Sequence, residues 1–399
     1  MGDHVTIVFG DLGAGEHLQS FLASRKVETT AWRRFQSIVY VLGLFHVKMA
    51  CADALWRVFI RDAKNQDADP FSFVNFIRAM KWPDIAKMKS GPKFRRMNDA
   101  IVQVGQVSRL HCWLEECGHQ SLEDFAAAEP TYDDLYALAV HIAKGSCSIG
   151  TLSHLRRQSS AERDQVKENS VLRNHLLLLY EELAYSINWG DIGRLESVFI
   201  PWMYIFRATG KNKYSTWLHK YMRDVHFRFP EGLKRSVRYN IIQFPDGKNG
   251  HGRGVDWFVE FTNLYSKRIH GGQGSNHTKE RLIKESPLIR LYGTARHEVE
   301  GAFRVQRGIN NHGTPKLKRT FKKLLDYLSD NDNRPHLLKP GRTAQYILPN
   351  VILEGRRDMA EKGPGNIRGE RTYKSRDVDD LAIAKSVRNV NHLSPLISE

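Results

Sequence analysis

Two short runs of apolar, β-branched residues stand apart from the helical pattern that dominates the rest of the chain. The first run, residues 5–9, is followed by Asp11 and a glycine-containing helical stretch. The second, residues 37–44, leads directly into His46 and a long helix. Continuous apolar runs of this length are typical of buried parallel strands. The order predicts two adjacent parallel strands joined by a crossover helix, with Asp11 and His46 at their carboxyl ends.

The remaining pattern divides the chain into three further parts. After an N-terminal part of residues 1–60, helical periodicity replaces β-rich runs over 61–250, which predicts a large helical insertion. Residues 251–345 read as helices that complete the core. Residues 346–399 are basic, with few apolar positions, and are expected to be a largely disordered tail. The helical period is clearest at Leu172, Leu176, Leu179, Leu183 and Ile187.

The stretch from 254 to 286 reads as a helix, a glycine-rich turn and a second helix that Asn276 or Thr278 can cap. The apolar stripe of the first helix comprises Trp257, Phe261 and Leu264. Its polar stripe comprises Asp256, Glu260, Asn263 and Lys267. Taken alone, the polar stripe is best interpreted as the wet side of an amphipathic helix. The strand-end residues near the N-terminus favour the alternative, in which the stripe carries chemistry.

The composition indicates an anionic binding partner. The chain of 399 residues has a net charge of +16, which points to nucleic acid, and we expect DNA. The four cysteines show no repeated CxxC spacing, so free thiols in a reducing compartment are expected. No uncharged apolar run reaches the length of a membrane span, so no membrane partner is expected. The composition does not decide whether the chain forms a homo-oligomer.

One segment near residue 217 interleaves basic and aromatic side chains, as backbone-gripping and base-stacking surfaces do. The predicted DNA contacts are Lys211, Lys213, Tyr214, Trp217, Lys220 and Arg223, together with Lys267 of the later stripe. The alternative is a structural helix whose aromatic residues face the core and whose lysines face water. The segment alone favours neither interpretation.

Several common sites are excluded or disfavoured by spacing. A dinucleotide fingerprint after the first strand would need glycine or alanine where Leu18 stands. No GxSxG elbow and no P-loop occur. The HCWLEECGH stretch contains His111, Cys112, Cys117 and His119. These lie within one probable helix and its end with no second ligand pair, so structural cysteines and surface histidines are favoured over zinc binding.

The remaining constellation is Asp11, His46 and Glu260. It resembles the second aspartate, the histidine and the glutamate of DDE-type transposases, which have an RNase H-like core. The late motif of Mutator-like elements in that group is NxxExxN; here Asp256 stands for the first Asn, while Glu260 and Asn263 match. The resemblance implies that Asp11 and Glu260 bind Mg²⁺ for attack of activated water on a DNA phosphodiester, with His46 orienting the site and Asn263 completing it.

The chain also resembles, more closely, a fungal family of transposon-related domains of unknown function that is common in mushroom-forming fungi. The shared motifs are Gly10-Asp11, Phe45-His46, ATGKNKY over 208–214, the helix from Asp256 to Lys267 and GSNHT over 274–278. The likeness extends to about Tyr346. It implies a lineage and a nuclear location, and it establishes no reaction.

One departure from the transposase pattern limits the expected activity. Asp11 takes the second-acid position, and no strand-end acid supplies the first catalytic aspartate. A two-metal site needs that bridging carboxylate. We therefore expect an α/β, helix-dominated fold with a truncated RNase H-like core, a large α-helical insertion and weak or absent catalysis. If Asp11 and Glu260 share Mg²⁺, their carboxyl carbons lie within roughly 4–8 Å. The alternative function is a non-catalytic module that binds nucleic acid or protein.

Overall fold

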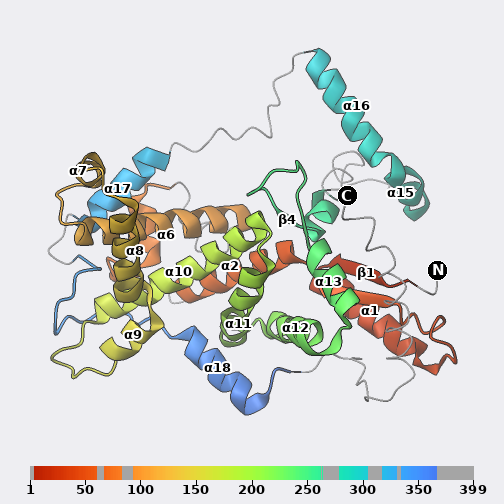
Figure 1. Ribbon diagram of the computed structural model, residues 1–399, viewed down its shortest axis with the longest axis horizontal. Helices are drawn as coiled ribbons and strands as arrows, with labels where there is room; N and C mark the ends of the chain where they lie inside the picture. Colours follow the sequence, from red (N-terminus) through yellow and green to blue (C-terminus); the bar gives the residue numbers. More distant parts are fainter. Residues whose placement is uncertain are drawn as a thin grey trace. The chain divides into compact units, whose positions relative to one another are not determined.

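Helices make up most of this protein (Figure 1). The computed structural model describes residues 4–60, 67–82, 93–261, 263, 278–303, 317–329 and 334–365. The strands are β1 (Thr6–Gly10), β2 (Ile38–Leu42), β3 (Ile242–Gln243) and β4 (Arg253–Gly254). The helices before residue 160 are α1 (Leu12–Ser24), α2 (Leu44–Ile60), α4 (Phe73–Ala79), α6 (Phe94–Glu116), α7 (Leu122–Ala127), α8 (Tyr132–Cys147) and α9 (Ile149–Leu155). Those after it are α10 (Gln165–Trp189), α11 (Ile192–Ala208), α12 (Asn212–Arg223), α13 (Glu231–Asn240), α15 (Lys279–Glu285), α16 (Ile289–Ala302), α17 (Leu317–Ser329) and α18 (Val351–Lys362). Among the described helices, none is long and apolar enough to cross a membrane.

The two β-branched runs pair as predicted. β1 and β2 are adjacent and parallel, in a register that places Thr6 opposite Ile38, and α1 connects them. Tyr40 of β2 packs against α1 at Gly15, where an added Cβ would lie 2.5 Å from the tyrosine ring. The Tyr40 hydroxyl donates to the Gly10 carbonyl at 2.9 Å. This close packing fixes the strand ends from which the candidate site is built.

The expected RNase H-like core is not evident in the described residues. There β1 pairs only with β2, and β3 and β4 form a separate antiparallel pair. A larger parallel sheet would be covered on both faces, whereas most residues of β1 are only half-buried. The fold is therefore helix-dominated with two very small sheets. The α/β prediction holds for the β1–α1–β2 segment and does not extend further.

The chain forms two compact units, each assembled from separate segments. Unit 1 contains the described residues up to 46 and those between 225 and 303. Unit 2 contains those between 47 and 224 and between 317 and 365. The divisions near residues 46 and 224 differ from the boundaries expected at 60 and 250. Composition changes gradually along the helices, so it does not mark the point at which the chain passes from one packed core to the next.

Unit 2 has a helical core around α10 and α11. Leu172, Leu176 and Leu183 of α10 are fully buried, which confirms the periodicity seen in the sequence. Trp202 and Phe206 of α11 are buried as well, with ring centroids 5.8 Å apart. Burial of these large side chains provides most of the driving force for this unit.

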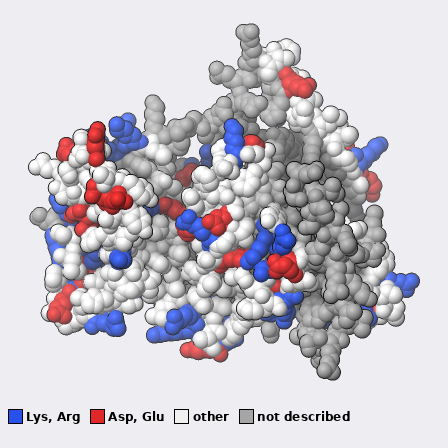
Figure 2. Space-filling model, in the orientation of Figure 1, with Lys and Arg blue, Asp and Glu red and all other residues white. Residues whose placement is uncertain are grey.

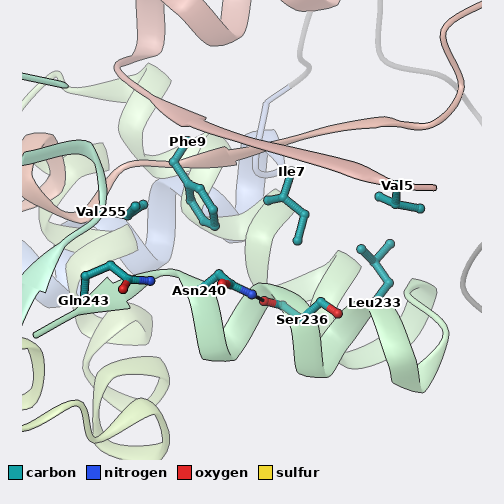
Figure 3. Close-up of a pocket in the computed structure, with 8 residues that line it drawn as sticks. All are labelled: Val5, Ile7, Phe9, Leu233, Ser236, Asn240, Gln243 and Val255. Carbon is teal, nitrogen blue, oxygen red and sulfur yellow. Dashed lines mark hydrogen bonds between the residues drawn. The ribbon is translucent and has the colours of Figure 1, made fainter. Parts of the chain in front are cut away.

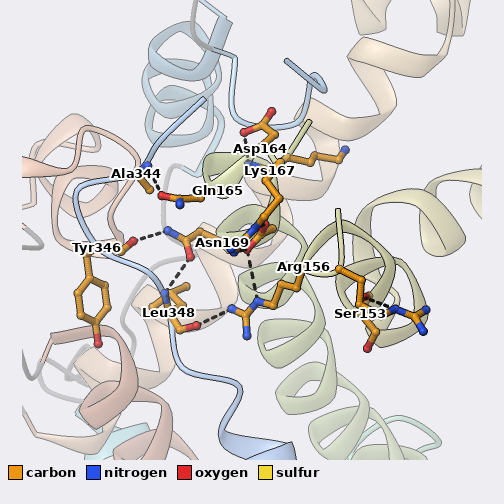
Figure 4. Close-up of polar contacts among 12 residues, drawn as sticks. Ser153, Arg156, Asp164, Gln165, Lys167, Asn169, Ala344, Tyr346 and Leu348 are labelled. Carbon is orange, nitrogen blue, oxygen red and sulfur yellow. Dashed lines mark hydrogen bonds and ion pairs between the residues drawn. The ribbon is translucent and has the colours of Figure 1, made fainter. Parts of the chain in front are cut away.

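A set of polar contacts holds an extended C-terminal segment against the start of α10 (Figure 4). Asp164, the N-cap of α10, forms an ion pair with Arg342 at 2.7 Å. Asn169 accepts a hydrogen bond from the Leu348 amide at 2.8 Å, and Arg156 donates to the Leu348 carbonyl at 2.7 Å. Because Asp164 is fully buried, the ion pair with Arg342 keeps its charge compensated.

The expectation of a disordered tail from residue 346 is wrong for its first part. Residues 351–362 form α18, which packs against α11. A Cβ on Gly355 would lie 1.8 Å from the Tyr204 carbonyl oxygen, so glycine permits this close approach of two helices. Arg207 forms an ion pair with Asp358 across the same contact. The helix escaped sequence analysis because its contact depends on one glycine and one valine, Val351, and not on an apolar stripe.

A network of buried polar side chains lies within unit 2. His336 is hydrogen-bonded through Nδ1 to Ser170 at 2.7 Å and through Nε2 to Ser108 at 3.2 Å. Its ring lies 5.1 Å from that of His111, which is fully buried. Cys112 is buried beside Asn174, with 3.6 Å between Sγ and Nδ2. Cys112 is therefore a structural core residue, as expected, whereas the expectation of a surface histidine is wrong for His111.

Candidate functional site

The predicted histidine lies at the start of α2, immediately after β2. Asp256 caps this helix from a distant part of the chain: its Oδ1 accepts from the Phe45 amide at 3.0 Å, and its Oδ2 accepts from the His46 amide at 3.1 Å. The same Oδ2 lies 2.9 Å from His46 Nδ1. Asp256 is only 1% exposed. The helix N-terminus, which carries partial positive charge, and the imidazole together compensate this buried carboxylate.

Two glycines make room for Asp256. A Cβ on Gly43 would lie 2.2 Å from Asp256 Oδ2, and one on Gly254 would lie 2.7 Å from Oδ1. The Gly254 Cβ would also approach Leu44 and the Phe45 backbone nitrogen to within 2.9 Å. Gly43 precedes the helix and has no side chain with which to cap it. Asp256, from a distant part of the chain, therefore takes the place of an N-cap side chain for α2.

Glu260 contacts the other side of the His46 ring. Residues 256–261 are helical, so Asp256 and Glu260, four residues apart, lie on one face. Glu260 Oε1 is 3.6 Å from His46 Nε2. The hydrogen bond to Asp256 raises the pKa of His46, the negative charges of Glu260 and Asp11 raise it further, and burial opposes them. The arrangement stabilises the imidazolium form.

Asp11 lies at the carboxyl end of β1 and is the N-cap of α1. Its Oδ1 accepts from the Ala14 amide at 2.7 Å. Its charge contributes to the raised pKa of His46, which places it within electrostatic range of that ring. Glu260 therefore lies beside His46, while Asp11 acts on the ring through its charge. The separation of the Asp11 and Glu260 carboxyl groups stays a prediction.

Sequence analysis identified the stripe of this helix but not the roles within it. Asp256 was treated as one position of the stripe, and it is the residue that holds His46. The stripe is not simply the wet side of the helix, because Asp256 is buried, whereas Phe261 on the expected apolar stripe is 42% exposed. The spacing of four residues between Asp256 and Glu260 was the available signal. Asn263 is exposed on the same helix, while Leu264 and Lys267 lie outside the described residues.

The cluster does not fit the two-metal magnesium site of DDE enzymes. Magnesium prefers an octahedral shell of oxygen ligands. Asp256 directs both oxygens at backbone amides, and Asp11 directs one at Ala14. Within the described ranges, no group of three or more His, Cys, Asp or Glu side chains could hold a metal ion. What the site can do is hold a protonated imidazole, oriented by Asp256, beside partly exposed Glu260.

The predicted DNA-binding segment forms α12, and its structure favours the alternative interpretation. Trp217 is 4% exposed and is therefore unavailable for stacking on a base. Lys211 pairs with Asp53 at 2.6 Å, and Lys220 and Arg223 both pair with Asp224. Among the basic residues of this segment, Lys213 is exposed. Tyr214 is half-buried, with its ring 5.4 Å from that of Phe206.

Charge pairing of this kind is visible on the surface. On the face shown in Figure 2, Lys and Arg side chains lie interspersed with Asp and Glu. On this face the described cations therefore form no continuous basic patch. A DNA interface must be sought where exposed cations coincide with exposed aromatic side chains.

That combination occurs in and just before α13. Residues 225–254 contain six Lys and Arg but only two Asp and Glu. Leu233 and Val237 bury one side of α13. His226, Glu231 and Asn240 are exposed here, and so are two arginines and two aromatic residues, which we call the α13 surface: Phe227, Arg228, Arg235 and Tyr239. Phe227 is 86% and Tyr239 75% exposed. Sequence analysis missed this surface, although the run KRSVRYN carries its charge and one of its aromatic residues.

Comparison with known proteins identifies one family. The model of a family described as "Family of unknown function (DUF6589)" matches residues 1–312, which is more than half of the chain. No curated protein and no solved structure matches the chain.

Proposed function

The chain belongs to the family of unknown function DUF6589, and on that premise we propose that it is a DNA-binding domain of transposase descent that acts in the nucleus. In this proposal the α13 surface contacts DNA, and the chain binds without cleaving efficiently. The carrying observation is the coincidence of exposed Phe227 and Tyr239 with exposed arginines in a segment of strongly positive charge.

The physical argument rests on what such a surface would do in water. Arginines near a polyanion release condensed counterions, which supplies sequence-independent affinity. Exposed aromatic rings add stacking energy when bases are accessible. Arg235 and Tyr239 are four residues apart on α13, so they project from the same helix face. A cation and a ring on one face can contact a phosphate and its neighbouring base together.

A salt titration tests the proposal. The full chain is titrated into fluorescently labelled duplex DNA at rising NaCl, and anisotropy reports binding. We expect binding at low salt that weakens steeply as salt rises, and we expect Arg235→Glu to reduce the slope by about one or more. The matched control is Lys213→Glu, the same reversal on α12, which should change affinity less. No binding at low salt contradicts the proposal, and a larger effect at Lys213 moves the interface back to α12.

The cluster around His46 supports a second candidate. We propose that in an intact relative the positions of Asp11 and Glu260 belong to a Mg²⁺-dependent phosphodiesterase site, of which this chain retains the histidine and two acids. The supporting observation is the convergence of these residues, with Glu260 3.6 Å from His46. Calorimetry with MgCl₂ should show weak binding that Glu260→Ala reduces and the exposed control Glu231→Ala does not. Tight binding that survives both substitutions contradicts this candidate.

A further inference from the structure

A groove of about 380 Å³ lies between β1 and α13 within unit 1 (Figure 3). Its upper wall in the figure is apolar. Ile7 and Phe9, which alternate along β1, point toward the helix, and Val5, just before β1, also lines this wall. The volume lies in the range of sites that hold one small ligand or one ring system of a larger ligand. Neither the cluster around His46 nor the α13 surface accounts for this groove.

The opposite wall combines apolar and polar groups. Leu233, Ser236 and Asn240 of α13 line it, and Gln243 and Val255 stand at one end. Ser236 Oγ donates to the Gly232 carbonyl at 2.8 Å, and Asn240 Nδ2 donates to the Ser236 carbonyl at 2.7 Å. In these two bonds Ser236 and Asn240 act as donors. The lone pairs of the Ser236 hydroxyl and the carboxamide oxygen of Asn240 can still accept hydrogen bonds from a ligand. The Gln243 amide adds both a donor and an acceptor.

A ligand that matches both walls is flat, apolar on its faces and able to hydrogen-bond along one edge. An unstacked nucleobase has this chemistry, because asparagine and glutamine amides pair with the donor and acceptor groups of base edges. The charge around the groove agrees. Arg235 and Tyr239 lie one residue before Ser236 and Asn240, so their stripe is about 100° around the same helix and can contact the backbone that carries the base.

We propose that the groove between β1 and α13 binds an unstacked base of single-stranded DNA, in support of the DNA binding proposed above and resting on it. The base enters between the Phe9 side and the amide wall while the α13 surface holds the adjacent phosphates. A base inside a duplex keeps its faces stacked and its edge paired, so a duplex contacts the α13 surface without filling the groove. The acceptors of Ser236 and Asn240 favour bases with an exocyclic amino group: adenine, cytosine and guanine.

The test compares three labelled oligonucleotides of equal length with the full chain at one salt concentration. These are a duplex, a cytosine-rich single strand and the same single strand with several bases removed to leave abasic sugars. We expect the intact single strand to bind at least about fivefold more tightly than the abasic strand. The abasic strand keeps its phosphates, so this difference isolates the bases. An all-thymine strand should bind less tightly than the cytosine-rich strand.

Two variants assign the effect to the groove. Asn240→Ala removes an exposed amide, and Gln243→Met keeps side-chain length while removing hydrogen bonding. Each should weaken single-strand binding by about fivefold or more and leave duplex binding unchanged. The matched control is Asn249→Ala, at an exposed loop position outside the groove.

The outcomes separate this inference from the proposal on which it rests. Equal affinity for intact and abasic strands, or unchanged binding in both groove variants, overturns the base site while salt-dependent DNA binding stands. Absence of binding to every oligonucleotide at low salt overturns both. Duplex and single-strand binding that fall together in Asn240→Ala and Gln243→Met assign these residues to general DNA contact and overturn the base site.

Discussion

His46 in unit 1 and His111 in unit 2 have pKa values shifted in opposite directions. In unit 1, His46 contacts the carboxylates of Asp256 and Glu260, and its pKa is raised chiefly by the hydrogen bond to Asp256. In unit 2, burial lowers the pKa of His111 to about 4, and nearby Arg334 and Lys167 lower it further. Burial also holds the pKa of His336 well below its usual value.

This difference between the histidine environments distinguishes a candidate functional site in unit 1 from a structural core in unit 2. In unit 2, burial keeps His111 and His336 neutral, and it does so although Glu115 Oε1 lies 3.3 Å from His111 Nε2. Unit 1 keeps a partly exposed imidazole beside acids, a setting that favours the charged form and leaves Glu260 partly exposed to solvent. Perturbed ionisable groups near a surface are candidates for function, while those sealed in a packed network are candidates for structure.

Acidification should have the largest effect on this comparison, by lowering the stability of unit 2. His111 has a folded pKa near 4 against 6.5 in the unfolded chain, so its contribution to stability is complete above pH 6.5 and disappears as pH falls through about 4. This amounts to about 3 kcal/mol from His111 alone, by the conversion of pKa shift to free energy. Hydrogen exchange measured by mass spectrometry at pH 7 and pH 4 localises the loss to α6 and α10.

Substitution provides the control for that prediction. His111→Asn should flatten the pH dependence, because the titrating ring is gone, although the variant starts from lower stability. His154→Asn, at an exposed position on α9, should leave the profile unchanged. If both variants keep the full acid effect, carboxylates elsewhere control the acid unfolding of unit 2.

Removing Asp256, which caps α2 from a distant part of the chain, should have the next largest effect, a loss of stability in unit 1. Asp256→Ala takes away acceptors from the amides of Phe45 and His46 and from the imidazole, which should destabilise this region by about 2 kcal/mol. Glu260→Ala removes a partly exposed acid with a single loose contact and should cost less than about 1 kcal/mol. Hydrogen exchange of peptides covering 37–50 measures both. Equal losses would mean that Asp256 is not the structural anchor of the site.

The sequence predicted one part of the fold, the pairing of two strands, and one contact near the candidate site. Strand pairing of residues 5–9 with 37–44 followed from β-branched runs and a crossover of suitable length, both of which are local signals. The motif order also indicated the contact of Glu260 with His46, at 3.6 Å, while a shared role of Asp11 and Glu260 stays a prediction. The capping of α2 by Asp256 could not be predicted, because it depends on the absence of a Cβ at Gly43 and Gly254 where distant segments meet.

Surface roles were harder to predict than strand ends for a physical reason. Basic residues in α12 and near α13 look alike in the sequence, but Lys211 and Lys220 have acidic partners in the folded chain. Trp217 and Tyr239 are both aromatic residues on basic helices, yet one is buried and the other exposed. Which side of a helix is covered depends on its tertiary neighbours, and the period of α12 gave no independent measure of them.

The smallest and sharpest effects concern the pKa of His46 itself, which NMR titration of its ring protons can follow. The pKa should exceed 6.5, and the stability that the charged ring confers on unit 1 is therefore complete below pH 6.5 and lost as pH rises through the folded value, opposite in sign to His111. Asp256→Asn should lower the pKa most, because it weakens a hydrogen bond as well as removing a charge. Glu260→Gln should lower it less, and Asp11→Asn least, since these acids act on the ring through charge alone. Raising the salt concentration should shrink the Glu260 and Asp11 effects more than the Asp256 effect, because exposed charges are screened and a buried contact is not. An Asp11→Asn effect equal to that of Asp256→Asn would place Asp11 in direct contact with the ring and would restore the case for a shared cation between Asp11 and Glu260.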